Sequence, residues 1–258
     1  MNFELENKIA LVTGGTKGIG LSIATAFIKQ GAKVIITARD EKTGAESASA
    51  LGSNCRFIPC DVTQPEQVEN VIREIEKEHG RLDILMNNAG SAVGMATVDK
   101  MEYEDWKFTI ETNLHSIFLM SKAALRLMIQ QKYGRIINMS SIEGKKASPT
   151  YGHYTASKHA IIGLTKTLAQ ENGVNNITSN AICPGLVYTD LIRDSMEETA
   201  KAKGTTAKEY LSAYVQTSAL KRPTELDEVA AICVFLASDA SSGITGTAIS
   251  VDGGDAIY

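Results

Sequence analysis

A tyrosine and a lysine stand four positions apart in the stretch Y-T-A-S-K, at Tyr154 and Lys158. One helical turn separates them, so in a helix both side chains emerge on the same face. An unperturbed tyrosine has a pKa near 10 and is a poor proton donor or acceptor at neutral pH. A neighbouring ammonium group stabilises the phenolate and lowers that pKa. The spacing therefore marks a candidate site of proton transfer.

A glycine-rich turn lies near the start of the chain. Residues 9–20 read I-A-L-V-T-G-G-T-K-G-I-G, with an apolar run before the glycines and a helical pattern after them. Missing side chains let a backbone approach a phosphate closely, and the N-terminus of a helix supplies N–H donors. The spacing G-x-x-x-G-x-G differs from G-x-G-x-x-G, but a strand, a turn and a helix follow one another as dinucleotide binding requires.

The end of the second apolar run, A-K-V-I-I-T-A-R-D, indicates which dinucleotide binds. Sites specific for NAD usually carry an acidic residue near the end of the second strand. Here Ala38 is followed by Arg39, and Lys17 in the glycine turn adds a second cation. Two cations favour the 2′-phosphate of NADP(H). Asp40, one position further, is a rival ligand for the ribose hydroxyls.

The elements that position these residues follow from short apolar runs that alternate with helical patterns. Apolar residues at consecutive positions are typical of parallel strands buried on both faces. The alternation predicts a doubly wound α/β fold in one domain, residues 1–258. Predicted strands are 9–13, 33–38, 56–60, 84–87, 134–139, 178–183 and 247–251, and predicted helices are 19–30, 41–51, 65–78, 103–131, 154–172 and 227–238.

One segment interrupts this alternation. About forty residues follow Cys183 without a clear strand pattern, and they contain polar, helix-favouring runs. An insertion of this length in a compact domain is more often a lid or binding loop with short helices than structureless coil. We expect a substrate lid over about 186–222.

Composition and charge argue against other kinds of partner. The formal net charge is −4, and no basic cluster resembles a nucleic-acid or lipid patch. We find neither a signal peptide nor the roughly 18 consecutive apolar residues of a membrane span. The cysteines at 55, 60, 183 and 233 are scattered, as reduced thiols are, and the histidines lack metal-ligand spacing. We expect a cytoplasmic protein that binds no nucleic acid, membrane or metal.

Together these motifs resemble the classical short-chain dehydrogenase/reductase family along nearly the whole chain. The matching residues are T-G-G-T-K-G-I-G at 13–20, D-V at 61–62, N-N-A-G at 87–90, Asn113, M-S-S at 139–141, Y-T-A-S-K at 154–158, P-G at 184–185 and S-V-D-G-G at 250–254. The first and last of these are shared with the 3-oxoacyl thioester reductase branch. The resemblance implies a Rossmann fold with a seven-stranded parallel sheet in the order 3-2-1-4-5-6-7, helices on both faces, and a homotetramer.

The resemblance also implies roles for individual residues. Ser141, thirteen positions before Tyr154, is the expected catalytic serine in preference to Ser140. Asn113 would hold a water that relays protons to Lys158. The implied cofactor contacts are Gly14, Thr16, Lys17, Gly18, Ile19, Gly20, Arg39, Asp61, Val62, Asn87, Ala89, Gly90, Tyr154, Lys158, Pro184, Gly185, Val187 and Thr189. Glu143, Lys145, Tyr151 and His153 either line the substrate pocket or lie on its rim.

These inferences predict an NADPH-dependent oxidoreductase that interconverts a ketone and a secondary alcohol, with Tyr154 as general acid and base. To act near pH 7, the pKa of Tyr154 must fall by about 3, equivalent to about 4 kcal/mol, through Lys158 and the oxidised nicotinamide. A 3-oxoacyl thioester reductase is one specialisation. The alternatives are an NAD-linked alcohol, sugar or steroid dehydrogenase, and a nucleotide-binding regulatory protein without catalysis.

Overall fold

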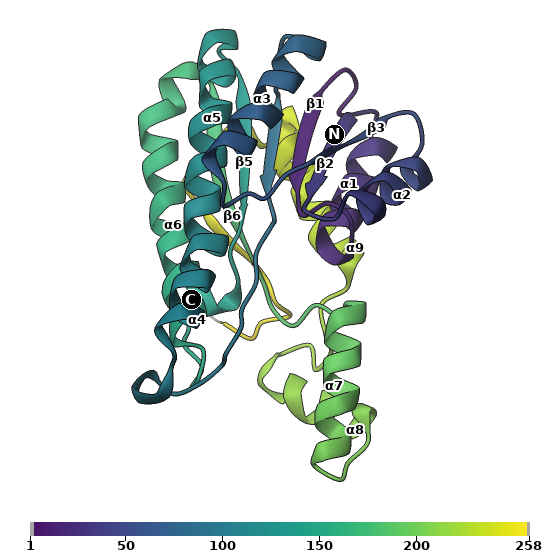
Figure 1. The fold of residues 1–258 in the computed structure, drawn as a ribbon, viewed down its shortest axis with the longest axis vertical. Coiled ribbons are helices and arrows are strands. Elements are labelled where there is room, and N and C mark those ends of the chain that lie inside the picture. Colours follow the sequence, from purple (N-terminus) through teal and green to yellow (C-terminus); the bar gives the residue numbers. More distant parts are fainter. Residues whose placement is uncertain (1–2, 257–258) are drawn as a thin grey trace.

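A computed structural model describes residues 3–256, apart from the side chains at 190, 191, 195, 198 and 202, so the extreme ends of the predicted domain lie outside it. Its centre is a seven-stranded sheet in the order β3-β2-β1-β4-β5-β6-β7, with every neighbouring pair parallel (Figure 1). This confirms the predicted fold class and strand order. The strands are β1 (Ile9–Thr13), β2 (Lys33–Ala38), β3 (Cys55–Pro59), β4 (Ile84–Asn87), β5 (Gly134–Met139), β6 (Ile177–Pro184) and β7 (Ala248–Val251).

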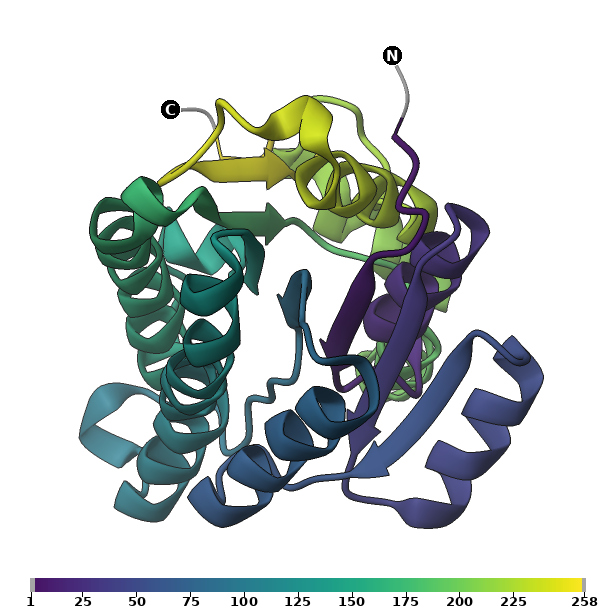
Figure 2. The same cartoon turned by 90° about the horizontal axis from the view of Figure 1, so that it is seen from above.

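Two apolar cores lie on opposite faces of the sheet because successive strand residues point to opposite sides. Ala10 and Val12 of β1 pack with α1 (Gly18–Lys29), α2 (Glu41–Leu51) and α9 (Leu226–Ala237). Ile9 and Leu11 of the same strand pack with α3 (Pro65–His79) and α5 (Ser116–Gln131). Figure 2 shows the blue α3 and the teal α5 on the side of the sheet opposite to the yellow-green α9. Burial on both faces explains the unbroken apolar runs of the strands.

The helix predicted over 103–131 is three elements. It consists of α4 (Tyr103–Ile110), a π-helical turn η2 (Glu111–His115) and α5. Asn113 lies in the middle of the π turn and bonds outside its own helix, to Ser91 and Ser157. A π turn inserts one extra residue into the helical repeat and is frequent at functional sites. The apolar periodicity on either side hid this interruption.

The other boundaries agree with prediction to within two residues, and several agree residue for residue. The last long helix before β6 is α6 (Gly152–Asn172), so Tyr154 and Lys158 lie in its first two turns. Short helical turns fill several connections: η1 (Val98–Lys100), η3 (Ile142–Gly144), η4 (Gly173–Asn175), η5 (Val215–Thr217) and η6 (Asp239–Ser241). Within the described residues, no helix has the length and apolar character needed to cross a bilayer.

The segment after β6 forms short helices, as expected for an insertion of its length. These are α7 (Asp190–Ala202), which Thr189 caps, and α8 (Ala207–Tyr214), which a Thr206–Glu209 capping box begins. Figure 1 shows both helices extending beyond the carboxyl end of β6, away from the layers that sandwich the sheet. The role of this segment as a substrate lid stays a prediction.

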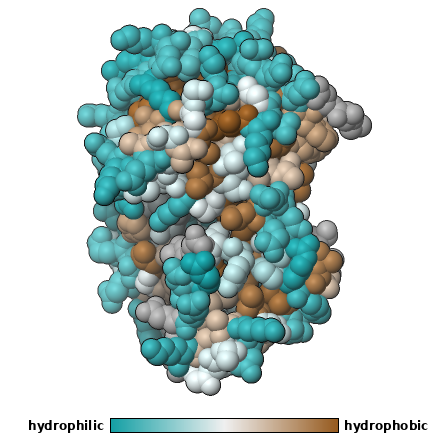
Figure 3. Space-filling model, turned by 90° about the vertical axis from the view of Figure 1, so that its right-hand side faces the viewer, coloured by the Kyte–Doolittle hydropathy of each residue, from teal (hydrophilic) through white to brown (hydrophobic). Residues whose placement is uncertain are grey.

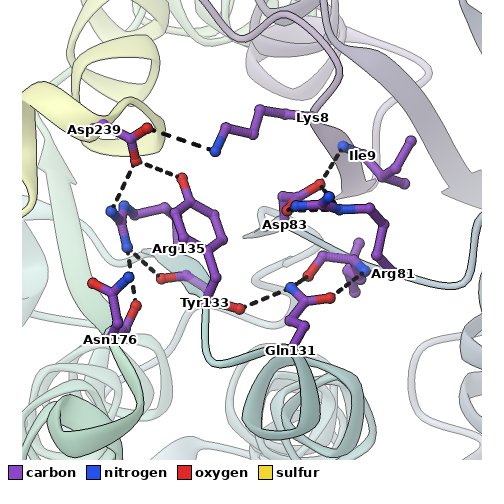
Figure 4. Close-up of polar contacts among 11 residues, drawn as sticks. Lys8, Ile9, Arg81, Asp83, Gln131, Tyr133, Arg135, Asn176 and Asp239 are labelled. Carbon is purple, nitrogen blue, oxygen red and sulfur yellow. Dashed lines mark hydrogen bonds and ion pairs between the residues drawn. The ribbon is translucent and has the colours of Figure 1, made fainter.

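The opposite, amino-terminal edge of the sheet carries a polar network (Figure 4). Arg135, 1% exposed, donates to Asp239 and to the carbonyl of Asn176, and its guanidinium lies over the ring of Tyr133. Asp83, fully buried, accepts the N–H of Ile9 and pairs with a flanking arginine. These contacts tie the starts of β1, β4 and β5 to η6.

Candidate active site

The glycine turn leaves no room for side chains where it meets the end of β4. A Cβ placed on Gly20 would lie 2.2 Å from the carbonyl oxygen of Gly14 and 2.5 Å from Nδ2 of Asn88. A Cβ on Gly14 would lie 3.1 Å from Cα of Ala89. Gly14 and Gly18 also have positive φ, at 63° and 53°. Here glycine is required by both space and backbone conformation.

Hydrogen bonds lock this turn to the N-N-A-G segment. Oγ1 of Thr13 accepts the N–H groups of Asn88 (2.9 Å) and Ala89 (3.0 Å). Nδ2 of Asn88 donates to the carbonyl oxygens of Thr13 (3.0 Å) and Gly14 (3.1 Å). Thr13 and Asn88 were not singled out from the sequence, although both stand inside motifs that were. They set the shape of the turn.

Asn87 braces the sheet from the end of β4. Its Nδ2 donates to Oγ of Ser121 on α5 and to Oδ1 of Asn138 on β5. Asn138 in turn donates to Thr165 on α6. Both amide protons of Asn87 therefore form hydrogen bonds within the protein. The residue is only 2% exposed, so little of its surface is left for the predicted cofactor contact.

The first turn of α1 fits a phosphate. Its N-cap position, Lys17, forms no side-chain capping bond, so no described side chain takes up the N–H groups of that turn. These donors and the partial positive charge of the helix N-terminus suit an anion. Thr16 tethers the turn to α2 by accepting from Ser47, and Ile19 turns into the apolar core. The residues present therefore fit the pyrophosphate of a dinucleotide.

The residues predicted to select NADP(H) lie beyond the end of β2. Arg39 and Lys17 are exposed, and their side chains form no hydrogen bond or ion pair with any described residue. Asp40 instead caps α2 by accepting the N–H of Thr43 at 2.6 Å. Hydrogen bonds with the side chain and the backbone of Thr43 lower the pKa of its carboxyl group. Further along, Asp61 accepts both the N–H and the hydroxyl of Thr63, and Val62 is buried.

The predicted proton-transfer residues come together at the carboxyl edge of the sheet. Tyr154 hydrogen-bonds Ser141, and Nζ of Lys158 lies 5.3 Å from the centre of the Tyr154 ring. A Cβ on Gly90 would lie 3.0 Å from Oδ1 of Asn113 and 3.7 Å from Nζ of Lys158. Residues from four separate segments, the β4 loop, the π turn, the end of β5 and α6, therefore converge on one place.

The two neighbouring serines have different partners. Oγ of Ser140, which is buried, donates to the carbonyl oxygen of Lys158 at 2.9 Å. Oγ of Ser141 accepts the N–H of Glu143 at 3.1 Å and lies against Tyr154. The geometry thus favours Ser141 as the serine that meets a substrate, and Ser140 as the one that holds α6.

Both polar atoms of the Asn113 side chain have a hydrogen-bond partner. Its Oδ1 accepts the N–H of Ser91 at 2.7 Å, and its Nδ2 donates to Oγ of Ser157 at 3.1 Å. Asn113 is 1% exposed, so its side chain positions the loop after β4. A water relay toward Lys158 stays a prediction.

Without a bound cofactor, the surroundings of Tyr154 do not lower its pKa, and the fall expected beside the oxidised nicotinamide stays a prediction. Burial raises the pKa of Tyr154 to about 12, the hydrogen bond with Ser141 opposes this rise, and Glu143 adds to it. Burial also lowers the pKa of Lys158 to about 8. Its Nζ donates to the carbonyl oxygen of Met139 at 2.8 Å. Desolvation is therefore the main influence on the pKa of both groups, and Tyr154 carries its proton at neutral pH.

The chain that leaves β6 returns to the glycine turn. Gly185 follows Pro184 and packs so closely that a Cβ there would lie 2.9 Å from Cα of Asp252. Val187 is buried and forms a bridge with Thr224. Thr189 lies 3.6 Å from where a Cβ of Gly18 would be. The start of the insertion thus faces the first helix of the dinucleotide site.

The residues that flank the serine and the tyrosine have different environments. His153 is fully buried: its Nδ1 accepts the N–H of Tyr154, and its Nε2 contacts the carbonyl oxygen of Val93 at 2.5 Å. Tyr151 packs edge-on against Tyr154, with ring centres 6.2 Å apart. Lys145 donates to Ser250 on β7. Within the described residues, no cluster of three or more His, Cys, Asp or Glu side chains could hold a metal.

Known proteins resemble this chain over nearly its full length. A family model described as enoyl-(acyl carrier protein) reductase matches residues 14–255. The 3-oxoacyl-(acyl-carrier-protein) reductase FabG of Vibrio cholerae is 38% identical and covers 97% of this chain and 98% of its own. A 3beta-hydroxysteroid dehydrogenase of Mediterraneibacter gnavus is 37% identical, over 98% of this chain and 96% of its own.

Solved structures also resemble this chain over nearly its full length. A variant of the actinorhodin polyketide ketoreductase with NADPH superimposes with a TM-score of 0.92 at 32% identity, covering 97% of this chain and 98% of its own. The aldohexose dehydrogenase of Thermoplasma acidophilum has a TM-score of 0.89 at 34% identity, covering 98% of this chain and 96% of its own.

Proposed function

Because the chain belongs to the classical short-chain dehydrogenase/reductase family, oxidoreductases that act on ketones and alcohols, we propose that it is an NADPH-dependent carbonyl reductase. One observation carries the proposal. Ser141, Tyr154 and Lys158 meet at the edge of the sheet that also carries the glycine turn. A protein that only bound nucleotides would not need a phenol, a hydroxyl and an ammonium group together there.

Tyr154 is the general acid of the reduction. It is protonated at neutral pH, as proton donation to a carbonyl oxygen requires. Ser141 donates a hydrogen bond to the same oxygen and stabilises the developing alkoxide charge. NADPH, when bound, supplies the hydride to the carbonyl carbon. In the oxidation of an alcohol, the phenolate of Tyr154 takes the proton back.

Lys158 and the glycine turn hold the cofactor in this account. The Lys158 ammonium lies near Gly90 and donates to the carbonyl oxygen of Met139, and this position supports its proposed role in binding the nicotinamide ribose. Its charge, together with that of the oxidised nicotinamide, favours the phenolate that remains after proton transfer. Arg39 and Lys17 supply charges for a 2′-phosphate. The ketoreductase with NADPH among the similar structures supports this choice.

The segment 186–222 forms the substrate lid. It starts beside the glycine turn, through Thr189, and Tyr214 at the end of α8 lies near enough to Tyr154 to influence its ionisation. Figure 3 shows the side of the molecule that lies on the right in Figure 1. Apolar side chains gather around the middle of this side, whereas its top is hydrophilic. A surface that mixes apolar and polar side chains suits a moderately hydrophobic carbonyl compound, such as a 3-oxoacyl thioester.

The test is loss of NADPH absorbance with a carbonyl panel that includes a 3-oxoacyl thioester, a steroid ketone and an oxidised sugar. Tyr154→Phe removes the proton donor and should lower kcat by about 10²–10⁴-fold while NADPH binding, followed by fluorescence, stays nearly intact. Tyr103→Phe, at an exposed position of α4, should change neither. Full activity in Tyr154→Phe, or no consumption of NADPH with any carbonyl compound, would rule the proposal out.

A homotetramer is part of the proposal. Large apolar side chains are exposed along α4 and α5, among them Trp106, Phe108, Phe118 and Ile129. Exposed apolar surface of this kind marks protein interfaces. Sedimentation velocity should give four times the mass of one chain, and a monomer at micromolar concentration would contradict it.

A further inference from the structure

His153 is a buried imidazole that directly precedes the proposed general acid. It is 0% exposed and lies in the first turn of α6. Its Nδ1 accepts the backbone N–H of Tyr154 at 2.9 Å, and its Nε2 lies 2.5 Å from the carbonyl oxygen of Val93 in the loop after β4. Tyr151, at the N-cap position, forms no side-chain capping bond. The imidazole therefore binds one of the N–H groups that the start of a helix leaves without a partner.

These two contacts fix the position of the imidazole hydrogen. A backbone N–H only donates, so Nδ1 of His153 must be the acceptor nitrogen. A carbonyl oxygen only accepts, so Nε2 must carry the hydrogen. Both bonds therefore form only in the neutral tautomer with its hydrogen on Nε2. An apolar side chain at this position would make neither bond.

A second route ties the carbonyl of Tyr154 to the same loop. Oγ of Ser157 donates to that carbonyl oxygen at 2.7 Å and accepts from Nδ2 of Asn113 at 3.1 Å. Oδ1 of Asn113 accepts the N–H of Ser91 at 2.7 Å. The two routes end two residues apart on the loop, so both backbone polar groups of Tyr154 are tied to residues 91–93.

The loop that these routes fasten borders the proposed site of the reaction. A Cβ on Gly90, the residue before the fastened stretch, would lie 3.7 Å from Nζ of Lys158. The phenol of Tyr154 hydrogen-bonds Ser141. A shift of the first turn of α6 against the loop would therefore move the phenol relative to the groups around it. Misplacement of a reacting group by about 1 Å costs about 10²-fold in rate.

We propose that His153 is a positioning residue, which holds the phenol of Tyr154 in the geometry of proton transfer by fixing the first turn of α6 to the loop after β4. The inference rests on the proposed function, because it takes Tyr154 as the proton donor. Since the imidazole is fully buried, it acts through Tyr154 and not on the substrate. This role differs from that of a residue that lines the pocket or lies on its rim.

The variant His153→Leu removes both bonds of the imidazole. Its kcat should fall by about 10–100-fold, because the phenol is no longer held in place. KM for the carbonyl compound and the affinity for NADPH should change little, since the imidazole contacts neither. His153→Gln keeps a donor for the carbonyl of Val93, and His153→Asn keeps an acceptor for the N–H of Tyr154. The kcat of each should lie between that of His153→Leu and wild type.

His159→Leu is the matched control. His159 lies on the same helix but is exposed, and its imidazole contacts only the carbonyl oxygen of Thr155. This variant should keep the wild-type kcat, KM and NADPH affinity. Circular dichroism and thermal melting check the folding of every variant, and His153→Gln and His153→Asn decide the matter if His153→Leu does not fold.

Two results would overturn the proposal. The first is a wild-type kcat in a folded His153→Leu, or in both His153→Gln and His153→Asn if His153→Leu does not fold. The second is a parallel loss of kcat, NADPH affinity and melting temperature in all variants of His153, which is expected of a residue that only supports the fold.

Two readouts without substrate separate this inference from the proposed function. Nitrogen-15 spectra of histidine-labelled protein, with His153→Gln as reference, should show the imidazole hydrogen of His153 on Nε2. The ¹³Cζ resonance of Tyr154, identified with Tyr154→Phe, should move in His153→Leu and return toward its wild-type position in His153→Gln. A hydrogen on Nδ1 or an unmoved tyrosine resonance would overturn the role of His153 even in an active reductase. The expected spectra in a protein that reduces no carbonyl compound would leave His153 in control of the position of Tyr154 and refute the proposed function alone.

Discussion

Arg39 and Asp40 are neighbours with opposite charge, and the structure gives them different partners. Asp40 caps α2, while the guanidinium of Arg39 is exposed beyond the end of β2 without a described partner. Arg39→Asp should therefore lower kcat/KM for NADPH by roughly 10–100-fold, the worth of a charged hydrogen bond, and favour NADH. Steady-state kinetics with both cofactors measure the shift.

The control for this prediction is Asp40→Ser, which keeps an oxygen for the helix cap and removes the carboxylate. It should leave the ratio of NADPH to NADH efficiency unchanged. If Asp40→Ser instead abolishes use of NADH and Arg39→Asp leaves NADPH kinetics intact, Asp40 is the ribose ligand and the NADP assignment is wrong.

At the level of single residues, the sequence identified which side chains meet but not their ionisation. The spacing of Tyr154 and Lys158 correctly placed both on one face of α6. Their pKa values depend on burial by β5, the η3 turn and α8, and no local pattern reports it. Glu143 could not be distinguished from a rim residue for the same reason: its partners, Ser148 and Thr155, are fixed only by the folded loop.

At the level of elements, two glycines inside helices provide a direct test of the glycine turn. Gly20 in α1 has no space, since a Cβ there would lie 2.2 Å from a backbone carbonyl oxygen. Gly163 in α6 is exposed, and a Cβ there would meet nothing within 4 Å. Gly20→Ala should force the turn apart, destabilise the protein and weaken NADPH binding. Gly163→Ala should stabilise it by up to about 1 kcal/mol through helix propensity and leave binding unchanged.

Urea unfolding and NADPH titration of both variants check this pair. Equal effects of the two substitutions would mean that the turn tolerates a side chain, and that the close packing against Asn88 does not shape the cofactor site. Normal NADPH affinity in Gly20→Ala would lead to the same conclusion.

Element boundaries followed from the sequence wherever a strand or helix was uniform along its length. Buried parallel strands give unbroken apolar runs, so β1, β2, β4 and β5 were predicted residue for residue. The π turn at Asn113 was missed because the bonds that the Asn113 side chain makes, to Ser91 and Ser157, are tertiary, and no local pattern reports them. The polar Asn113 among apolar neighbours was the available signal.

At the level of the whole molecule, the two edges of the sheet have opposite energetic characters. At the carboxyl edge, the ammonium of Lys158 is buried without an ion pair to a described residue, so the fold bears a cost there. At the amino edge, Arg135 and Asp239 are paired, and Tyr133 donates to the same carboxylate (Figure 4). The charged groups at the amino edge are paired with one another, although Nε of Arg135 has no hydrogen-bond partner, whereas the ammonium at the carboxyl edge is left to meet cofactor and substrate.

This contrast predicts opposite outcomes for Asp239→Asn and Lys158→Met. Although partial burial works against its charge, Tyr133, Lys8 and Arg135 lower the pKa of Asp239, so its stabilisation is present above the ordinary aspartate pKa near 3.8 and is lost as the pH falls through the lowered value. Asp239→Asn should lower stability at pH 7 by about 1 kcal/mol or less, since solvent screens the exposed carboxylate, and the deficit should vanish in acid while kcat/KM is unchanged.

Lys158→Met should do the reverse. A lysine with a pKa of about 8 when folded and near 10.5 when unfolded destabilises the fold below pH 8, and that cost disappears as the pH rises toward 10.5. The variant should lose turnover and cofactor affinity, yet its melting temperature relative to wild type should be higher at pH 7 than at pH 10. Differential scanning calorimetry across this range decides the matter. If the difference in melting temperature between the variant and wild type does not change with pH, burial of the ammonium costs the fold nothing. The carboxyl edge would then be no less stable than the amino edge.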